Sequence, residues 1–144
     1  MLIRDFLEVS GSLGMETGLI SIDQEKAFDR VEHHYLWHTL QFFGFSPGFI
    51  AMIQVLYCNI ESMLKINGGL SGPFEVQRGV RQGCSLSGML YSLAIEPLLH
   101  NIRKKLSGVV FPGGNGCFKI SAYADDVVVF LSRIKETSLS WRIL

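Results

Sequence analysis

The stretch Tyr123–Asp126 constrains the fold of this chain more than any other, because it sets two adjacent aspartates between apolar segments. Ile120–Ala122 precedes it and Val127–Leu131 follows it, and both have the composition of β-strands. Neighbouring carboxylates repel each other and need solvation, whereas the flanking segments favour a sheet. A tight turn between two strands satisfies both demands and leaves the aspartates where a cation can reach them. The pattern predicts a β-hairpin with a divalent-metal site; the alternative is an ordinary solvated Asp-Asp turn.

Composition indicates one compact domain. The chain has 144 residues, of which 48% are hydrophobic, and this supports a real core and argues against disorder. Thirteen basic and thirteen acidic residues give no net charge, which counts mildly against a nucleic-acid binder, although a local basic face is compatible with a neutral total. The longest apolar stretch, Phe49–Cys58, is interrupted by Gln54 and is shorter than the roughly 20 residues that a bilayer requires. We therefore expect no membrane contact.

The three cysteines indicate a reducing compartment. Cys58, Cys84 and Cys117 are far apart, no pair has zinc-ligand spacing, and an odd number argues against a disulfide framework. We expect reduced thiols in an intracellular protein. The nucleus and the cytoplasm both fit this pattern.

The order of helical and strand patterns predicts an α+β domain with an antiparallel sheet and helices packed on one face. Ser46 and Pro47 form a helix start, and the helix that follows is expected to point Ile53 and Leu56 toward the core. Asn67–Gly69 is a strong turn signal. The predicted helices cover 3–13, 32–43, 47–59 and 86–105, and the predicted strands cover 18–23, 62–66, 74–76, 108–111 and the closing hairpin.

A third carboxylate ends the first predicted strand. Asp23 follows apolar residues, where a carboxylate is costly unless something binds it, and Phe28 comes just past the strand end. The alternative is that Asp23 caps the next turn, that Phe28 belongs to the core, and that Asp29 caps the following helix.

The segment Arg78–Leu86 is a glycine-punctuated loop before a predicted helix. Glycines allow a backbone to approach a ligand closely, and a helix N-terminus favours anions. Arg78 and Arg81 add positive charge suited to phosphate. The alternative is a surface loop with two solvated arginines.

Together these segments contain what two-metal phosphoryl transfer requires. Asp23, Asp125 and Asp126 are three carboxylates able to hold two Mg²⁺ ions, and the glycine loop is suited to a phosphate group. In such a site one ion activates a hydroxyl and the other neutralises charge on the triphosphate and the leaving pyrophosphate.

In order and spacing, the stretches Asp23–Val31, Arg81–Cys84 and Ala122–Asp126 resemble the successive palm motifs of reverse transcriptases, most closely those of non-LTR (LINE-type) retrotransposons. The resemblance runs from about Ile3 to Ser132. It implies a polymerase palm, a ferredoxin-like antiparallel sheet with helices on one face, and RNA-directed DNA synthesis from deoxynucleoside triphosphates with Mg²⁺, or with Mn²⁺ in its place. An RNA template and a DNA primer are the implied partners.

The resemblance also implies roles by position. Asp23, Asp125 and Asp126 correspond to the catalytic metal-binding aspartates, with the Gln24 backbone carbonyl as a further ligand. Phe28 corresponds to a steric gate against a 2′-hydroxyl. Further expected contacts are those of Arg81, Gln82 and Gly83 with the incoming nucleotide, and those of Arg78 and Tyr123 with primer and template.

The chain departs from the family pattern in two ways. The loop usually continues with two prolines, where this chain has Ser85 and Gly88. Loss of the proline at position 85 loosens the helix start, although Ser85 can cap the helix. Incomplete fingers and no thumb are expected beside the palm. We expect residues 1–132 to form a partial reverse transcriptase domain and residues 133–144 to form a divergent or truncated tail.

Two other functions fit the same residues. One is a catalytically inactive, truncated relic that binds nucleic acid or a protein partner. The other is a palm-type RNA polymerase or nucleotide cyclase, against which Phe28 argues because it indicates a preference for deoxynucleotides.

Overall fold

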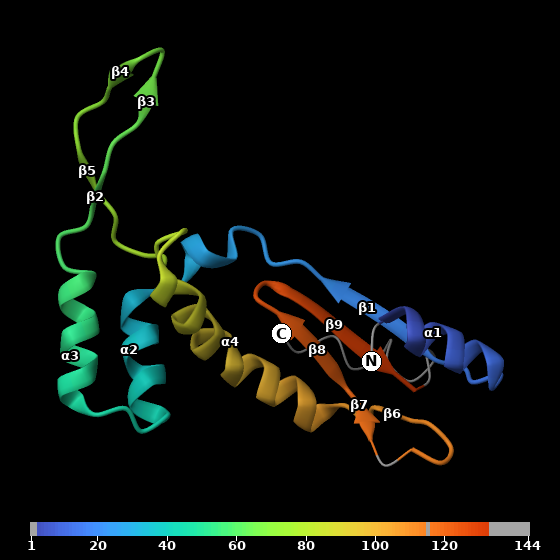
Figure 1. The fold of residues 1–144 in the computed structure, drawn as a ribbon. Coiled ribbons are helices and arrows are strands. Elements are labelled where there is room, and N and C mark those ends of the chain that lie inside the picture. Colours follow the sequence, from blue (N-terminus) through green and yellow to red (C-terminus); the bar gives the residue numbers. More distant parts are fainter. Residues whose placement is uncertain (1–2, 115, 133–144) are drawn as a thin grey trace. The chain divides into compact units, whose positions relative to one another are not determined.

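The computed structural model describes residues 3–114 and 116–132, which form two compact units (Figure 1). The first unit combines the start of the chain, through Gln24, with the segment from Leu98 onward. The second unit is the continuous segment Glu25–Pro97. The long helix α4 (Ser85–Lys105) belongs to both units and continues through Pro97 without a break.

The first unit is built around a three-stranded antiparallel sheet. β9 (Asp126–Leu131) is the middle strand, with β1 (Gly18–Ile22) on one side and β8 (Ile120–Tyr123) on the other. The hairpin of β8 and β9 is the one that the apolar pattern around Tyr123–Asp126 predicts. The remaining elements of this unit are α1 (Ile3–Ser12), the end of α4, and the paired strands β6 (Val109–Val110) and β7 (Cys117–Phe118).

Aromatic rings from distant segments form the core of the first unit. Phe6 of α1 is 1% exposed, and its ring centroid lies 4.7 Å from that of Phe130 on β9 and 5.3 Å from that of Phe111. Val109 is buried in the same cluster. Phe6 therefore fastens α1 to the sheet through edge-on and tilted ring contacts, a favourable geometry for aromatic pairs.

The second unit is mainly helical. Its helices are the 3₁₀ helix η1 (Ala27–Arg30), α2 (His33–Phe42), α3 (Pro47–Leu56) and the first part of α4. A long arm follows α3 and extends away from α2 and α3 in Figure 1. Its short strands pair antiparallel as β2 (Glu61–Ser62) with β5 (Phe74–Glu75) and β3 (Lys65–Ile66) with β4 (Gly69–Leu70).

Local sequence signals at the helix start and the arm tip are confirmed. The Ser46 hydroxyl accepts a hydrogen bond from the Phe49 N–H at 3.2 Å, and Pro47 is the first residue of α3. At the arm tip, Asn67 has φ 49° and Gly68 has φ 83°, and both lie in the left-handed region that a tight two-residue hairpin turn requires.

Two expectations for the second unit are wrong. The strand expected over 62–66 is broken between β2 and β3, because the Ser71 hydroxyl accepts from the Leu64 N–H at 2.9 Å and so replaces a strand–strand bond. The other concerns α3: Ile53 is 2% exposed, as expected, but Leu56 is 53% exposed and faces away from the core.

The described residues confirm a mixture of helices with small antiparallel sheets. The tail expected at residues 133–144 lies outside them. Within the described part of the chain, no helix combines the length and the apolar character needed to cross a membrane.

We expect Phe6→Ala to lower the free energy of unfolding by about 3–5 kcal/mol, because it removes a buried ring that contacts several others. Leu7→Ala is the matched control on the same helix, since Leu7 is 54% exposed, and its effect should stay within about 0.5 kcal/mol. Urea denaturation followed by circular dichroism measures both. Similar losses for the two variants would contradict the assignment of this core.

Candidate active site

Three aspartates lie at one end of the three-stranded sheet. β1 and β9 pair antiparallel from Gly18↔Leu131 to Ile22↔Val127, so the next residues along this register are Asp23 and Asp126. On the other side of β9, Asp126 pairs with Tyr123. Asp126 thus stands between the ends of both neighbouring strands, and Asp125 precedes it in the turn. The pairing of β1 with β9 thus places Asp23 at the same end of the sheet as Asp125 and Asp126, which are far from it in the sequence.

The turn that carries Asp125 has an unusual backbone. Ala124 has φ 52°, a left-handed conformation that costs a residue with a Cβ about 1–2 kcal/mol. Asp125 is half-buried, whereas Asp23 and Asp126 are exposed, and Tyr123 is 84% exposed. The turn therefore holds a strained conformation at the point where it presents a carboxylate and an aromatic side chain.

The donor chemistry of this edge suits a hard divalent cation, because Mg²⁺ and Mn²⁺ prefer carboxylate oxygens. The geometry is looser than that of a formed metal site. Among residues 3–114 and 116–132, no three His, Cys, Asp or Glu side chains come close enough together to hold one metal ion. The structure thus supports a shared edge for the aspartates and not a finished coordination shell.

In the second unit, the segment from Phe28 of η1 to Glu32 is hydrogen-bonded to the glycine loop. The Val80 N–H donates to the Phe28 carbonyl at 2.8 Å, and the Gly79 N–H donates to the Val31 carbonyl at 2.7 Å. Glu32 and Arg78 form a further antiparallel bridge. Two segments that the sequence identifies separately, one with Phe28 and one with Arg78–Leu86, are therefore joined by main-chain hydrogen bonds.

Gly79 permits this close approach. Its φ is +94°, and a Cβ at this position would lie 3.0 Å from both the Cα and the carbonyl oxygen of Asp29. Both are main-chain atoms that cannot rotate away. The sequence analysis predicts that the glycines of this loop allow a close approach to a ligand; at Gly79 the close neighbour is the chain's own backbone, and the approach to a ligand stays a prediction.

The side chains of the loop line a cavity of about 390 Å³. The Gln82 side-chain amide donates to the Asp29 carboxylate at 3.2 Å. The alternative interpretation, in which Asp29 caps the next helix, is wrong, because Glu32 occupies the N-cap position of α2. Gly83 follows with φ +83° and an open surrounding. The residues that line the cavity are Asp29, Ile60, Val76, Arg78, Gly79, Val80, Arg81 and Gln82.

Sequence reasoning missed the partner of Phe28. The Phe28 ring stacks on Tyr91 of α4, with 4.4 Å between ring centroids and 16° between ring planes. Tyr91 is 2% exposed and Phe28 is half-buried. The helical pattern of α4 could have marked Tyr91 as a buried position, but no local signal pairs it with Phe28.

Cys84 ends the loop, immediately before α4. Hydrogen bonding from the Leu86 N–H holds the pKa of the Cys84 thiol below its usual value, and the Ser87 side chain and N–H act in the same direction. The nearby Arg81 charge adds to this effect. All three cysteines are free and exposed, which agrees with the expectation of reduced thiols.

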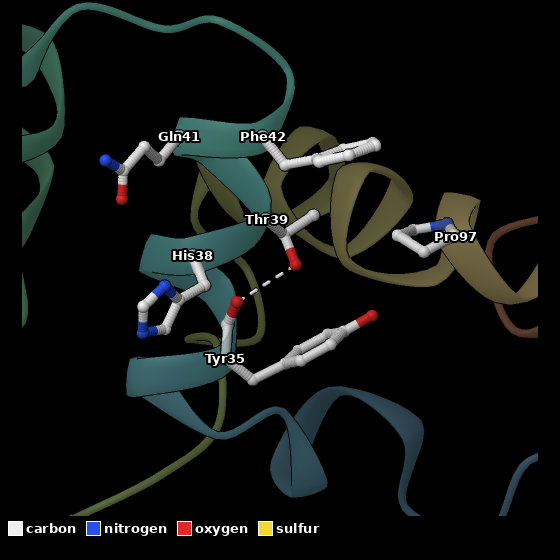
Figure 2. A pocket seen from close by; sticks show the side chains of 6 residues that line it. All are labelled: Tyr35, His38, Thr39, Gln41, Phe42 and Pro97. Carbon is white, nitrogen blue, oxygen red and sulfur yellow. Dashed lines mark hydrogen bonds between the residues drawn. The ribbon is translucent and has the colours of Figure 1, made fainter.

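A second cavity, of about 500 Å³, lies between α2 and α4 within the second unit (Figure 2). The Thr39 hydroxyl donates to the Tyr35 carbonyl at 2.9 Å, and the Tyr35 hydroxyl donates to the Ala94 carbonyl at 2.9 Å. None of the predicted site residues lines it. The lining residues are Tyr35, His38, Thr39, Gln41, Phe42 and Pro97.

A family model described as reverse transcriptase (RNA-dependent DNA polymerase) matches residues 3–144. The chain belongs to the reverse transcriptase family. The resemblance to non-LTR retrotransposon reverse transcriptases is thereby confirmed, and members of this family generally use divalent metal ions and act on nucleic acids.

Most of this reverse transcriptase chain is similar to a part of proteins from transposable elements. An uncharacterized 149 kDa protein of transposon TX1 from Xenopus laevis is 49% identical over 128 residues, which are 89% of this chain and 10% of that protein. The Pol polyprotein of the type-2 retrotransposable element R2DM from Drosophila melanogaster is 32% identical over 126 residues, 88% of this chain and 11% of that protein. The chain thus spans about a tenth of the length of these two relatives.

Gly79→Ala should destabilise this reverse transcriptase chain by about 2–4 kcal/mol, because left-handed strain adds to a main-chain clash with Asp29. Gly83→Ala is the matched control. It has a similar φ but no atom within 4 Å of the added Cβ, so we expect about 1–2 kcal/mol from strain alone. Chemical denaturation measures both losses. If the two losses are equal, the backbone contact at Gly79 does not constrain the loop.

At neutral pH, Cys84 should react with iodoacetamide faster than Cys58 and Cys117. Its lowered pKa means that more of this thiol is thiolate at pH 7, and that its rate reaches a plateau at a lower pH. Peptide mass spectrometry after timed alkylation at several pH values measures each site. Equal rates and equal pH profiles would refute the prediction.

Proposed function

We propose that this chain carries the catalytic palm of an RNA-directed DNA polymerase from a non-LTR retrotransposon, with residues 1–132 as a partial reverse transcriptase domain. The substrates in this proposal are an RNA template, a DNA primer and deoxynucleoside triphosphates. The main support is the sheet register, in which Asp126 of β9 stands between the end of β1 and the end of β8. The family match provides the reaction class. An intracellular location stays a prediction.

In this proposal, Asp23, Asp125 and Asp126 hold the divalent ions, with the Gln24 carbonyl as a further ligand. When bound, Mg²⁺ or Mn²⁺ would lower the pKa of the primer 3′-hydroxyl and neutralise charge on the leaving pyrophosphate. The support from the structure is that the aspartates share one sheet edge and expose two of their three side chains to incoming ligands. The pairing of β1 with β9 and the β8–β9 hairpin set the backbone spacing of the three aspartates, and in this proposal their side chains would adjust to a bound cation.

The remaining residues position the nucleotide and the strands. Arg81, Gln82 and Gly83 would contact the incoming nucleotide, and Phe28 would exclude a 2′-hydroxyl. Arg78 and Tyr123 would contact primer and template; the exposed Tyr123 ring is suited to stacking against a sugar or base. The cavity beside the loop supports an anion-binding role, because two of its lining residues are arginines. The single carboxylate there, Asp29, accepts from Gln82.

Asp125→Asn should reduce metal-dependent primer extension by about 10²-fold or more, the scale of removing one group that stabilises transition-state charge. The substitution keeps the size of the side chain and removes the charge that binds the cation. Extension of a DNA primer on an RNA template with Mg²⁺ and deoxynucleotides measures it. Glu16→Gln is the control, since Glu16 is an exposed carboxylate outside the site, and its extension rate should stay unchanged.

Two results would count against the proposal. Extension at the wild-type rate by Asp125→Asn would remove this aspartate from the reaction. Absence of metal-dependent extension by the wild-type chain would favour the alternative, an inactive relic that binds nucleic acid or a protein.

A further inference from the structure

The ring of Phe28 is held from one side by a buried aromatic residue of another element. Tyr91 of α4 is 2% exposed, and its ring lies 4.4 Å from that of Phe28 at an angle of 16°. Phe28 itself is half-buried. A buried side chain in a packed interior keeps one rotamer, so Tyr91 acts as a fixed surface for the ring above it.

The backbone of Phe28 is held independently. Its carbonyl accepts from the Val80 N–H at 2.8 Å, and the carboxylate of the next residue, Asp29, accepts from Gln82 at 3.2 Å. With the backbone fixed by the glycine loop, only the side-chain torsions of Phe28 stay free, and stacking on Tyr91 restricts them. The loop thus fixes the backbone position of Phe28, and Tyr91 of α4 fixes the orientation of the Phe28 ring.

We propose that Tyr91 is a positioning residue that orients the Phe28 ring and thereby sets the discrimination between deoxyribonucleotides and ribonucleotides. This inference rests on the role proposed for Phe28 above. Discrimination against one hydroxyl group requires a rigid pocket wall, because a ring that is free to rotate can move aside and admit the larger sugar. Tyr91 contributes that rigidity without touching the nucleotide itself.

Ordinary core packing is the competing explanation for a buried tyrosine. It predicts that Tyr91 contributes to stability alone, as Leu40 of α2 does with 0% exposure. A positioning role predicts in addition that loss of the ring changes sugar discrimination. Leu40→Ala is therefore the matched control, because it opens a cavity in the same unit and lacks a ring that could stack on Phe28.

The first measurement concerns the ring alone. The chain is labelled with 4-fluorophenylalanine, and the Phe28 signal in the fluorine NMR spectrum is assigned by its disappearance in Phe28→Leu. We expect this signal to shift in Tyr91→Leu, because the ring current of Tyr91 is lost, and to stay close to its wild-type position in Tyr91→Phe and Leu40→Ala. An unchanged signal in Tyr91→Leu would overturn the inference.

The second measurement concerns discrimination. The chain is titrated with dATP and with ATP in the presence of Mn²⁺, and the ratio of the two affinities is compared among variants. A pocket wall that rejects one small group is worth about 10- to 200-fold. We expect Phe28→Ala to lose about this factor and Tyr91→Leu to lose a large part of it. Tyr91→Phe and Leu40→Ala should keep the wild-type ratio.

The outcomes separate the inference from the proposed function. A ratio lowered in Phe28→Ala but unchanged in Tyr91→Leu would overturn the positioning role of Tyr91 and leave Phe28 as the gate. A ratio unchanged in both would overturn the role of Phe28 and the inference with it. If neither nucleotide binds the wild-type chain, the proposed function is contradicted, whereas the fluorine signal still decides whether Tyr91 fixes the ring.

Discussion

The antiparallel pairing of β1 with β9 is the constraint on which the candidate active site depends. It joins a segment near the start of the chain to one near its end, so the entropy of closing a long loop opposes it. Burial offsets this: Val127, Val129 and Phe130 of β9 are buried, and Phe6 packs against Phe130. The same apolar contacts that form the core therefore align the strand ends that carry the carboxylates.

A second constraint of a different kind organises the segment Glu25–Pro97. There the glycine loop forms main-chain hydrogen bonds with η1 and the residue after it, and Gly79 allows the contact because it has no side chain. Main-chain bonds use no side-chain atoms, so the side chains of the loop are not needed to form them. The side chains of Arg78 and Arg81 then line the adjacent cavity, and the side-chain amide of Gln82 donates to Asp29.

Helix caps and tight turns could be predicted from the sequence, whereas long-range pairing could be predicted only in part. The Ser46 cap, the Asn67–Gly68 turn and the closing hairpin follow from short-range rules, and the structure bears them out. The break in the expected 62–66 strand depends on Ser71, whose hydroxyl comes from the opposite side of the arm. The residues 62–66 themselves do not contain that information.

The candidate site also has features that the sequence predicts and features that it does not. The three aspartates and the glycine loop carry recognisable patterns, because metal and phosphate chemistry demands particular residue types at particular spacings. The pairing of Phe28 with Tyr91, and of Gln82 with Asp29, arises only when distant elements pack. Neither Tyr91 nor Asp29 has a residue type that sets it apart from an ordinary aromatic or a surface carboxylate.

The register of β9 has a consequence for how this chain tolerates changes of length. One residue inserted between Val127 and Leu131 would turn the side chains beyond it to the opposite face, exchange buried valines for exposed ones, and shift the β1 pairing. The turn between β6 and β7 joins only a two-residue pair, and its Gly113 and Gly114 lie at the surface. Insertions and deletions among related sequences should therefore accumulate between Pro112 and Gly116 and be absent between Tyr123 and Leu131.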